Sequence, residues 1–221
     1  MLKKIIIGGI ILAIVTVGVL YLIPWGEYES QVDKSEITNE VIYDESTPIV
    51  APQIEKGIYY TTVPENASSA EILFHTKGLK DTKGGFNAFT IDFNVADEFT
   101  QSLLDVVIEA KSINSGNALR DEHLLEEDFF HVEKYPTIEY HASKIDFGDT
   151  SYVAQGALTL NGTTKDLAVP FLYLGSASNE GVNAEVFEGK FIFDRTDYGQ
   201  EESSGVGNEV TINFYCELLK K

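Results

Sequence analysis

The fold is decided by residues 89–95, Phe-Thr-Ile-Asp-Phe-Asn-Val, in which apolar and polar residues alternate. Successive side chains of a strand point to opposite faces, so this period of two predicts a β-strand with one apolar and one polar face. Phe89, Ile91, Phe93 and Val95 share the apolar face, which must be buried against other elements. The rest of the fold depends on where the chain repeats this pattern.

The alternation recurs from Gly57 to the C-terminus, and it predicts eight or nine strands. The other runs are residues 58–62, 70–76, 104–110, 137–147, 152–160, 167–173, 187–193 and 210–218. Asn161-Gly162 lies between two runs and suits the two positive-φ positions of a type I′ turn, so the flanking strands are antiparallel neighbours. We therefore expect one all-β antiparallel domain over residues 57–221. Its sheet can close as a barrel or fold as a sandwich.

The alternation stops between Asn117 and Tyr135. Leu119, His123, Leu124 and Glu127 fall there at helical spacing. A short helix inside the β-domain is expected.

An uncharged stretch of nineteen residues, Ile5 to Ile23, precedes the domain. As a helix it would rise about 28 Å, close to a hydrocarbon core of about 30 Å. It ends in bulky residues, whereas signal cleavage sites carry small ones, so we expect an uncleaved single-pass anchor over residues 1–25. Lys3 and Lys4 lie before it, which by the positive-inside rule puts the N-terminus in the cytoplasm and the domain outside, in the periplasm.

Residues 26–56 are acidic, and Pro48 and Pro52 interrupt any helix there. Low hydrophobicity and like-charge repulsion keep such a segment extended. We expect a flexible stalk, with a docking segment as the alternative.

The net charge of −19 and the single cysteine exclude several classes of protein. An acidic field repels nucleic acid, so no nucleic-acid partner is expected. One cysteine, Cys216, makes an intramolecular disulfide or a cysteine-rich zinc site impossible.

Motifs for catalysis and metal binding are missing as well. The sequence has no phosphate-binding loop, GxSxG elbow, HExxH motif or EF-hand loop. His75, His123, His131 and His141 lack the spacing that puts two imidazoles of one element on one ion. We expect no metal, no cofactor and no enzymatic activity.

The most informative stretch is residues 112–124, Ser-Ile-Asn-Ser-Gly-Asn-Ala-Leu-Arg-Asp-Glu-His-Leu, which continues to Asp128-Phe129-Phe130 and Tyr135-Pro136. It resembles the YceI-like family, whose members carry a Ser-Ile-x-Thr-Gly-Asn turn, then Arg-Asp-x-His-Leu, Asp-Phe-Phe and Tyr-Pro. Residues 156–165, Gly-Ala-Leu-Thr-Leu-Asn-Gly-Thr-Thr-Lys, and 195–199, Arg-Thr-Asp-Tyr-Gly, are similar to two further motifs of that family. Ser115 stands where the family usually has threonine.

This resemblance implies an eight-stranded lipocalin-like antiparallel barrel with a short helical cover. It also implies an elongated apolar pocket that takes a polyisoprenoid or a similar long-chain lipid, which would be the one bound group. Members of the family are usually exported and cleaved, whereas this chain is expected to stay anchored.

If the sheet closes, alternate strand positions face the interior. The predicted ligand-binding lining consists of Phe89, Ile91, Phe93, Leu104, Val106, Ile108, Phe191, Phe193, Ile212 and Phe214. These side chains either fill the barrel or line a cavity.

Arg120, Asp121 and His123 are interpreted first as structural. A guanidinium paired with a carboxylate, and an imidazole bonded to the backbone, would pin the helical cover to the barrel. The alternative is a polar collar around a ligand headgroup. Arg195 and Asp197 share a face if the chain is extended there, and a structural pair is expected.

The sequence thus predicts a non-enzymatic carrier or binding protein for a long apolar lipid, tethered outside the cytoplasm in a bacterial envelope. A structural or protein-interaction module with a filled barrel is the alternative. An enzyme that uses His123 and Asp121 as acid and base is the third hypothesis. The expected partners are the lipid and, through the N-terminal helix, the membrane; a homodimer is left open.

Overall fold

The computed structural model describes residues 28, 30, 32–43, 48–65, 69–79, 81–179, 181–202 and 205–221. The expected anchor at residues 1–25 lies outside these residues and stays a prediction. Across the residues that are described, no helix has the length and apolarity that a membrane crossing needs.

Strands dominate the described part of the chain, which also holds one α-helix and three short 3-10 turns. The strands are β1 (Ile37–Glu40), β2 (Gly57–Val63), β3 (Ala70–Thr76), β4 (Thr82–Phe86), β5 (Phe89–Val95), β6 (Leu103–Glu109), β7 (Ile113–Asn114), β8 (Thr137–Phe147), β9 (Tyr152–Leu160), β10 (Thr163–Asn179), β11 (Val182–Asp194) and β12 (Glu209–Lys220). The helix is α2 (Ala118–Leu124), and the turns are η1 (Phe99–Gln101), η2 (Ala110–Ser112) and η3 (Arg195–Tyr198).

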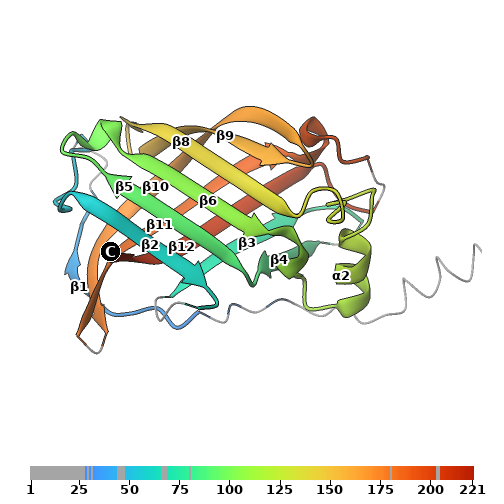
Figure 1. The fold of residues 1–221 in the computed structure, drawn as a ribbon, viewed down its shortest axis with the longest axis horizontal. Coiled ribbons are helices and arrows are strands. Elements are labelled where there is room, and N and C mark those ends of the chain that lie inside the picture. The colour runs from blue at the N-terminus through green and yellow to red at the C-terminus, as the bar shows by residue number, and fades with distance from the viewer. Residues whose placement is uncertain are drawn as a thin grey trace, which may run out of the picture.

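Eight of the described strands close into an antiparallel barrel (Figure 1). Their order around the ring is β2-β5-β6-β8-β9-β10-β11-β12, and β12 returns to β2 through the pairs Leu219–Tyr60 and Lys220–Tyr59. Closure pairs the backbone groups that the edges of an open sheet would expose. The predicted antiparallel barrel is confirmed, and the sandwich is excluded.

The strand β12 also carries a side sheet. Its residues 210–216 pair with β3, which in turn pairs with β4, and β4 pairs with β7. The side sheet leads into α2, whose first turn is capped by Asn117, because its side chain accepts the Arg120 backbone N–H at 3.1 Å. The short helix predicted between Asn117 and Tyr135 is confirmed.

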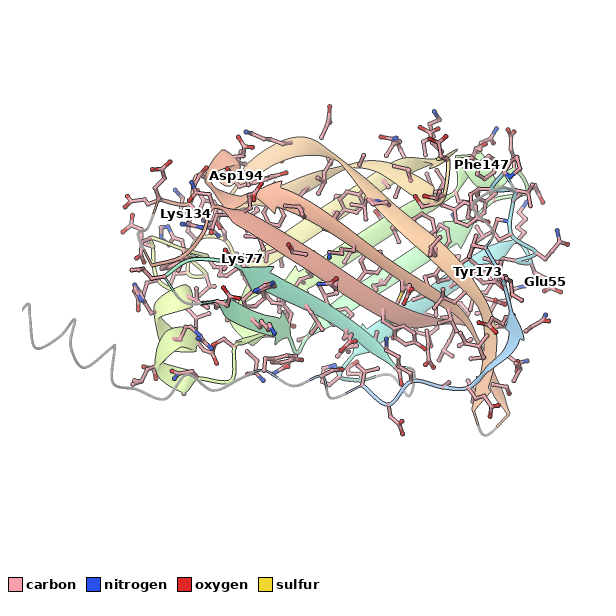
Figure 2. All side chains as sticks on the ribbon, turned by 180° about the vertical axis from the view of Figure 1, so that it is seen from behind. Glu55, Lys77, Lys134, Phe147, Tyr173 and Asp194 are labelled. Carbon is pink, nitrogen blue, oxygen red and sulfur yellow. The ribbon has the colours of Figure 1, made fainter. Side chains whose placement is uncertain are left out.

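The two ends of the barrel differ. One end is covered by α2 (Figure 1), and we call it the α2 end. Figure 2 shows Lys77, Lys134 and Asp194 at this end, and Glu55 and Phe147 at the opposite end. The strand β11 spans the barrel from the opposite end to the α2 end, since it finishes at Asp194.

The predicted Asn161-Gly162 turn is confirmed. Both residues have positive φ, 50° and 69°, and the strands on either side pair antiparallel from Leu160–Thr163 onward. This turn fixes the register of β9 and β10, because a two-residue loop is too short to let one strand shift along the other.

The acidic stretch 26–56 makes contacts that the stalk hypothesis did not include. Its strand β1 pairs with β10, and the hydroxyl of Tyr152 donates to the Val50 carbonyl at 2.7 Å. Ser35 donates two hydrogen bonds to the buried Glu217, at 2.8 Å from the backbone N–H and 2.7 Å from the hydroxyl. The described residues of this stretch lie against the barrel, as a docking segment would. The division of the chain at residues 25 and 56 stays a prediction.

A pH-dependent contact joins β6 and β8 on the outer face. His141 Nδ1 lies 2.7 Å from Asp105 Oδ1, and this hydrogen bond raises the pKa of the imidazole above its ordinary value. The folded state therefore binds the imidazole proton more tightly than the unfolded state does. The resulting stability is fully present below about pH 6.5 and is lost as the pH rises through the folded pKa.

We expect His141→Gln to lower the melting temperature of the detergent-solubilised chain more at pH 5.5 than at pH 8.5. The loss at pH 5.5 should stay under about 1 kcal/mol, because the pair is half exposed to solvent. Thermal unfolding followed by circular dichroism at the two pH values measures it. Asp105→Asn should show the same trend, and a loss that does not change with pH would contradict the assignment.

Candidate functional site

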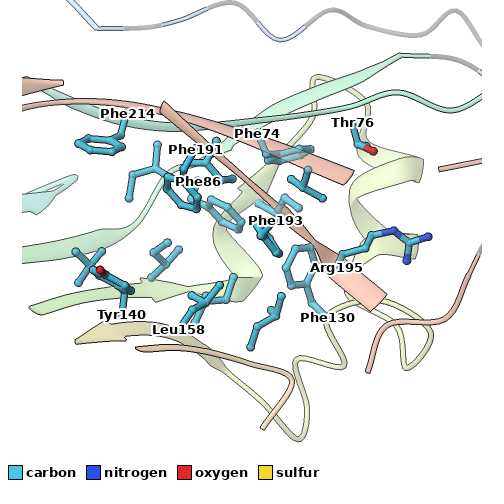
Figure 3. Close-up of a pocket in the computed structure, with 18 of the residues that line it drawn as sticks. Phe74, Thr76, Phe86, Phe130, Tyr140, Leu158, Phe191, Phe193, Arg195 and Phe214 are labelled. Atoms are coloured by element: carbon cyan, nitrogen blue, oxygen red, sulfur yellow. The ribbon is translucent and has the colours of Figure 1, made fainter. Parts of the chain in front are cut away.

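An elongated cavity of about 710 Å³ occupies the interior of the barrel (Figure 3). This volume lies within the range of about 300–1,000 Å³ that is typical of small-molecule sites. Its walls are almost entirely aliphatic and aromatic side chains from every strand of the ring except β2. The inward face of β12 shows the pattern, since Val210, Ile212, Phe214, Cys216 and Leu218 all line the cavity.

Nine of the ten predicted lining residues border the cavity: Ile91, Phe93, Leu104, Val106, Ile108, Phe191, Phe193, Ile212 and Phe214. Phe89 does not. It is buried in the packed core at the start of β5, between Val63 of β2 and Ile108 of β6. Period-two alternation identifies the side of the sheet that a residue faces, but it does not show where along the barrel packing ends and open space begins. That these nine lining residues contact a ligand stays a prediction.

Several lining residues were not named from the sequence. Ile72, Phe74 and Thr76 of β3 line the cavity at period two, so the alternation in 70–76 was enough to find them. Phe129 and Phe130, from the loop after α2, also line it. They carry no strand pattern, and their place depends on how that loop folds back over the barrel.

Aromatic rings close the deep part of the cavity. Phe93 contacts Phe187 and Phe171 edge to face, with ring centroids 5.5 and 6.4 Å apart. Behind them Tyr152 packs against Phe171 at 5.4 Å and against Phe99 at 5.3 Å. Phe99 and Tyr152 are buried, 6% and 2% exposed, and do not border the cavity, so packed side chains close the end opposite α2.

The cavity opens at the α2 end. Two of its lining residues are exposed there: Leu79, in the turn after β3, is 67% exposed, and Leu119 of α2 is 55% exposed. Figure 3 shows Thr76 and Arg195 on the side of the helix, and Phe214 and Tyr140 farther from it.

The hydroxyls of Tyr140 and Thr76 in the wall are hydrogen-bonded within the protein. The Tyr140 hydroxyl donates to carbonyls of Ala154 and Leu167 at 2.8 and 3.1 Å, and burial raises the pKa of this phenol. The Thr76 hydroxyl donates to the Gly207 carbonyl at 2.9 Å. The interior therefore presents an apolar surface to any ligand.

Arg195 is a buried cation at the α2 end, 3% exposed. Its guanidinium donates to the carbonyls of Gly207, Glu201 and Val206 at 3.0, 2.6 and 3.3 Å, and burial lowers the pKa of the group. The expected pair with Asp197 is wrong, because Asp197 binds Lys165 at 2.7 Å instead. Residues 195–198 form the turn η3 and are not extended, so side chains two apart do not share a face.

Arg120 and Asp121 converge on Ser115. The Arg120 Nε–H donates to the Ser115 hydroxyl at 2.7 Å, and the backbone N–H of Ser115 donates to Asp121 Oδ1 at 2.8 Å. His123 Nε2 lies 3.1 Å from Asp128 Oδ2, so its partner is a carboxylate and not the expected backbone group. These contacts tie α2 to the turn before it and to the loop after it, whereas the structural interpretation had them pin the helix to the barrel. The structural role and the polar collar both stay predictions.

The titratable side chains around α2 bear on the enzyme and metal hypotheses. Asp121 and His123 bond to different partners, Ser115 and Asp128. Within the described residues, no three His, Cys, Asp or Glu side chains gather as metal ligands would. Arg120, His123 and Arg195 border the cavity, whereas Asp121 and Asp197 do not.

The fold and the cavity together define a lipocalin-like antiparallel β-barrel with an internal apolar chamber that opens at one end. The chain belongs to the YceI-like domain family, whose model matches residues 60–218.

Similar proteins come from several bacteria. A UPF0312 protein of Shewanella oneidensis is 30% identical over 179 residues, which is 78% of this chain and 93% of that protein. The crystal structure of BcnA from Burkholderia cenocepacia matches with a TM-score of 0.58 at 21% identity, covering 67% of this chain and 95% of that one. A polyisoprenoid binding domain from Saccharophagus degradans matches with a TM-score of 0.53 at 11% identity, covering 76% and 100%. At these identities the solved structures establish the shared fold.

Replacing Arg195 tests whether its role is structural. We expect Arg195→Met to lower the free energy of unfolding by about 3 kcal/mol or more, because a hydrogen bond from a charged donor contributes about 1.5–3 kcal/mol and three carbonyls lose theirs. Asp197→Asn is the control, since it removes an exposed ion pair that contributes less than about 1 kcal/mol. Urea unfolding measures both. An Arg195→Met protein of unchanged stability that binds lipid less well would support the polar collar instead.

Proposed function

We propose that the protein is a non-enzymatic carrier that holds a polyisoprenoid or a similar long-chain lipid inside its barrel. In this proposal residues 1–25 tether it to the membrane, with the barrel on the extracytoplasmic side. The observation that carries the proposal is the apolar cavity of about 710 Å³, sealed at one end and open at the other. An apolar chamber with one opening suits a flexible hydrocarbon chain.

The size of the cavity bounds how tightly it holds a chain. At about 30 Å³ for each water-sized group, 710 Å³ accommodates on the order of 24 such groups. At about −0.3 kcal/mol per heavy atom, these contribute about −7 kcal/mol, which corresponds to a dissociation constant on the order of 10 μM. A tail of about 40 carbons would leave part of its length outside the cavity, so the full −12 kcal/mol or so of such a tail would not be realised. Binding of this strength permits exchange with a bilayer.

Two further observations support an apolar ligand. The polar atoms of Tyr140, Thr76 and Arg195 are already hydrogen-bonded within the protein, so a polar ligand would find few partners. The Saccharophagus degradans domain, which shares the fold, is a polyisoprenoid binding domain. The tether is supported by the uncharged run Ile5–Ile23 with Lys3 and Lys4 before it.

The alternatives have weaker support. A protein-interaction module with a filled barrel is disfavoured, because side chains of this barrel leave an open chamber. An enzyme that uses His123 and Asp121 is disfavoured, because the two side chains bond to different groups, Asp128 and Ser115, and not to a shared one.

Native mass spectrometry of the full chain, purified in detergent from a bacterial host, tests the proposal. Because a dissociation constant on the order of 10 μM lets a ligand dissociate during purification, lipid extract from the host is added back at about 100 μM, and we then expect an apolar long-chain lipid at near one per chain. Phe191→Asp should abolish it by placing a charge in the cavity wall, whereas Ile192→Asp should retain it, because Ile192 is 55% exposed on the outer face of the same strand. Empty wild-type protein, or equal lipid content in the two folded variants, would contradict the carrier.

A further inference from the structure

The described residues between Tyr28 and Tyr43 run along the outside of the barrel, and we call these residues, 28, 30 and 32–43, the strap. At the end opposite α2, its strand β1 pairs with β10, where Ile37 lies opposite Ala177. From there toward the N-terminus the strap passes β12 and β3 and reaches β4, so it runs back toward the α2 end (Figures 1 and 2). Tyr28 lies over β4, because a Cβ added to Gly85 would come within 2.9 Å of its hydroxyl.

The barrel surface is adapted to hold the strap. Glu217 is 3% exposed, and its carboxylate accepts two hydrogen bonds from Ser35 and one from Tyr215, at 2.8 Å. A buried carboxylate that loses such donors is strongly disfavoured, so Glu217 requires the strap in place. Lys34 adds a cation over the Tyr215 ring, with Nζ 4.1 Å from the centroid.

Apolar packing and a glycine also hold the strap against the barrel surface. Val32 and Ile37 pack on a small cluster formed by Ala177, Val186 and Tyr215. Gly175 has φ +124°, and a Cβ there would lie 2.0 Å from the Asn39 carbonyl oxygen. The backbone of β1 can approach β10 this closely only because residue 175 lacks a side chain.

A docked strap shortens the link between the apolar N-terminal run and the barrel. Ile23 and Tyr28 are five residues apart, a reach of at most about 18 Å. A free chain from Pro24 to Lys56 would instead have a root-mean-square span of about 32 Å and a far longer maximum. The 13 residues of β11 extend about 43 Å along the strand, which at a strand tilt of about 40° corresponds to about 33 Å along the barrel axis. A link this short, fixed over β4, favours the α2 end as the end that faces the anchor.

The surface at the α2 end combines exposed apolar side chains with acidic ones. Leu79 and Leu119 project at the opening of the cavity. Residues 118–134 around them carry six acidic and two basic side chains. Two leucines surrounded by acidic side chains bind a bilayer only weakly. A short tether raises the effective concentration of the α2 end at the membrane, and stable contact depends on that increase.

We propose that the α2 end docks on the bilayer surface with Leu79 and Leu119 in contact with lipid, and that the strap holds the barrel in this orientation. This inference rests on the anchor of the proposed function and names the surface through which a ligand is exchanged. The opening of the cavity then faces the bilayer directly, and a lipid tail passes between the two without crossing water.

Fluorescence quenching in vesicles tests the orientation. The full chain is reconstituted into dioleoylphosphatidylcholine vesicles that contain a doxyl-labelled lipid, with an environment-sensitive fluorophore on Leu119→Cys or, as control, on Val182→Cys at the start of β11. Native Cys216 is buried and its pKa is raised to about 12 by burial, so wild-type protein should take up little label. We expect quenching at position 119 to exceed that at 182 at least threefold. Equal quenching, or a chain that does not associate with the vesicles, would overturn the inference.

Two matched insertions test the strap. Twenty Gly/Ser residues between Trp25 and Tyr28 lengthen the tether from about 5 to about 25 residues, which lowers the effective concentration about tenfold, so quenching at position 119 should fall severalfold. The same insert between Tyr43 and Pro48 lies after the docked strap and should leave quenching unchanged. An equal fall from both inserts would show that the strap does not hold the barrel.

Lipid content separates this inference from the proposed function. Both insertion variants keep the cavity intact, so native mass spectrometry should find the same lipid as in wild type. Lipid present without the quenching difference would overturn the docked orientation alone. A quenching difference with an empty cavity would overturn the carrier alone.

Discussion

Closure of β12 onto β2 is the constraint on which the rest of the structure depends. Each strand of the ring has one apolar face, and closing the ring directs all of these faces to a common interior while it pairs the backbone groups of the would-be edges. The strand β12 does this while also pairing with β3, so the side sheet and α2 are attached to the closing strand itself. The chamber, its cover and its opening thus follow from one set of strand pairings.

The interior stays partly open because its two ends are built differently. At one end aromatic rings, including Phe93, Phe187 and Tyr152, meet edge to face and fill the cross-section. At the other end a seven-residue helix and loops finish the walls, and the lining residues Leu79 and Leu119 remain exposed there. Gly189 contributes to the shape, since a Cβ there would lie 2.4 Å from the Phe214 ring, and its absence lets that ring lie along the wall.

Sequence reasoning performed best where one periodic rule applied. Alternation placed nine of ten lining residues, and Asn161-Gly162 fixed one hairpin, because both signals act over a few neighbouring residues. The partners of Arg195 and His123 were missed, because each depends on how the loop that follows the residue folds back on it. The contacts of Ser35 were missed for a different reason: Glu217 lies 182 residues away, and a charged residue in a strand pattern gives no sign that it is buried.

The sealed aromatic end has a consequence for anything the chamber contains. A chamber with one opening admits and releases a ligand through the same opening. The apolar end of a hydrocarbon chain therefore enters first and leaves last. A polar group on such a molecule would stay outside the opening near Leu79 and Leu119, together with any length of tail beyond the roughly 24 groups that the cavity accommodates. The barrel would then expose the polar end of its ligand and bury the apolar end. A bound ligand would therefore have a fixed orientation in the barrel.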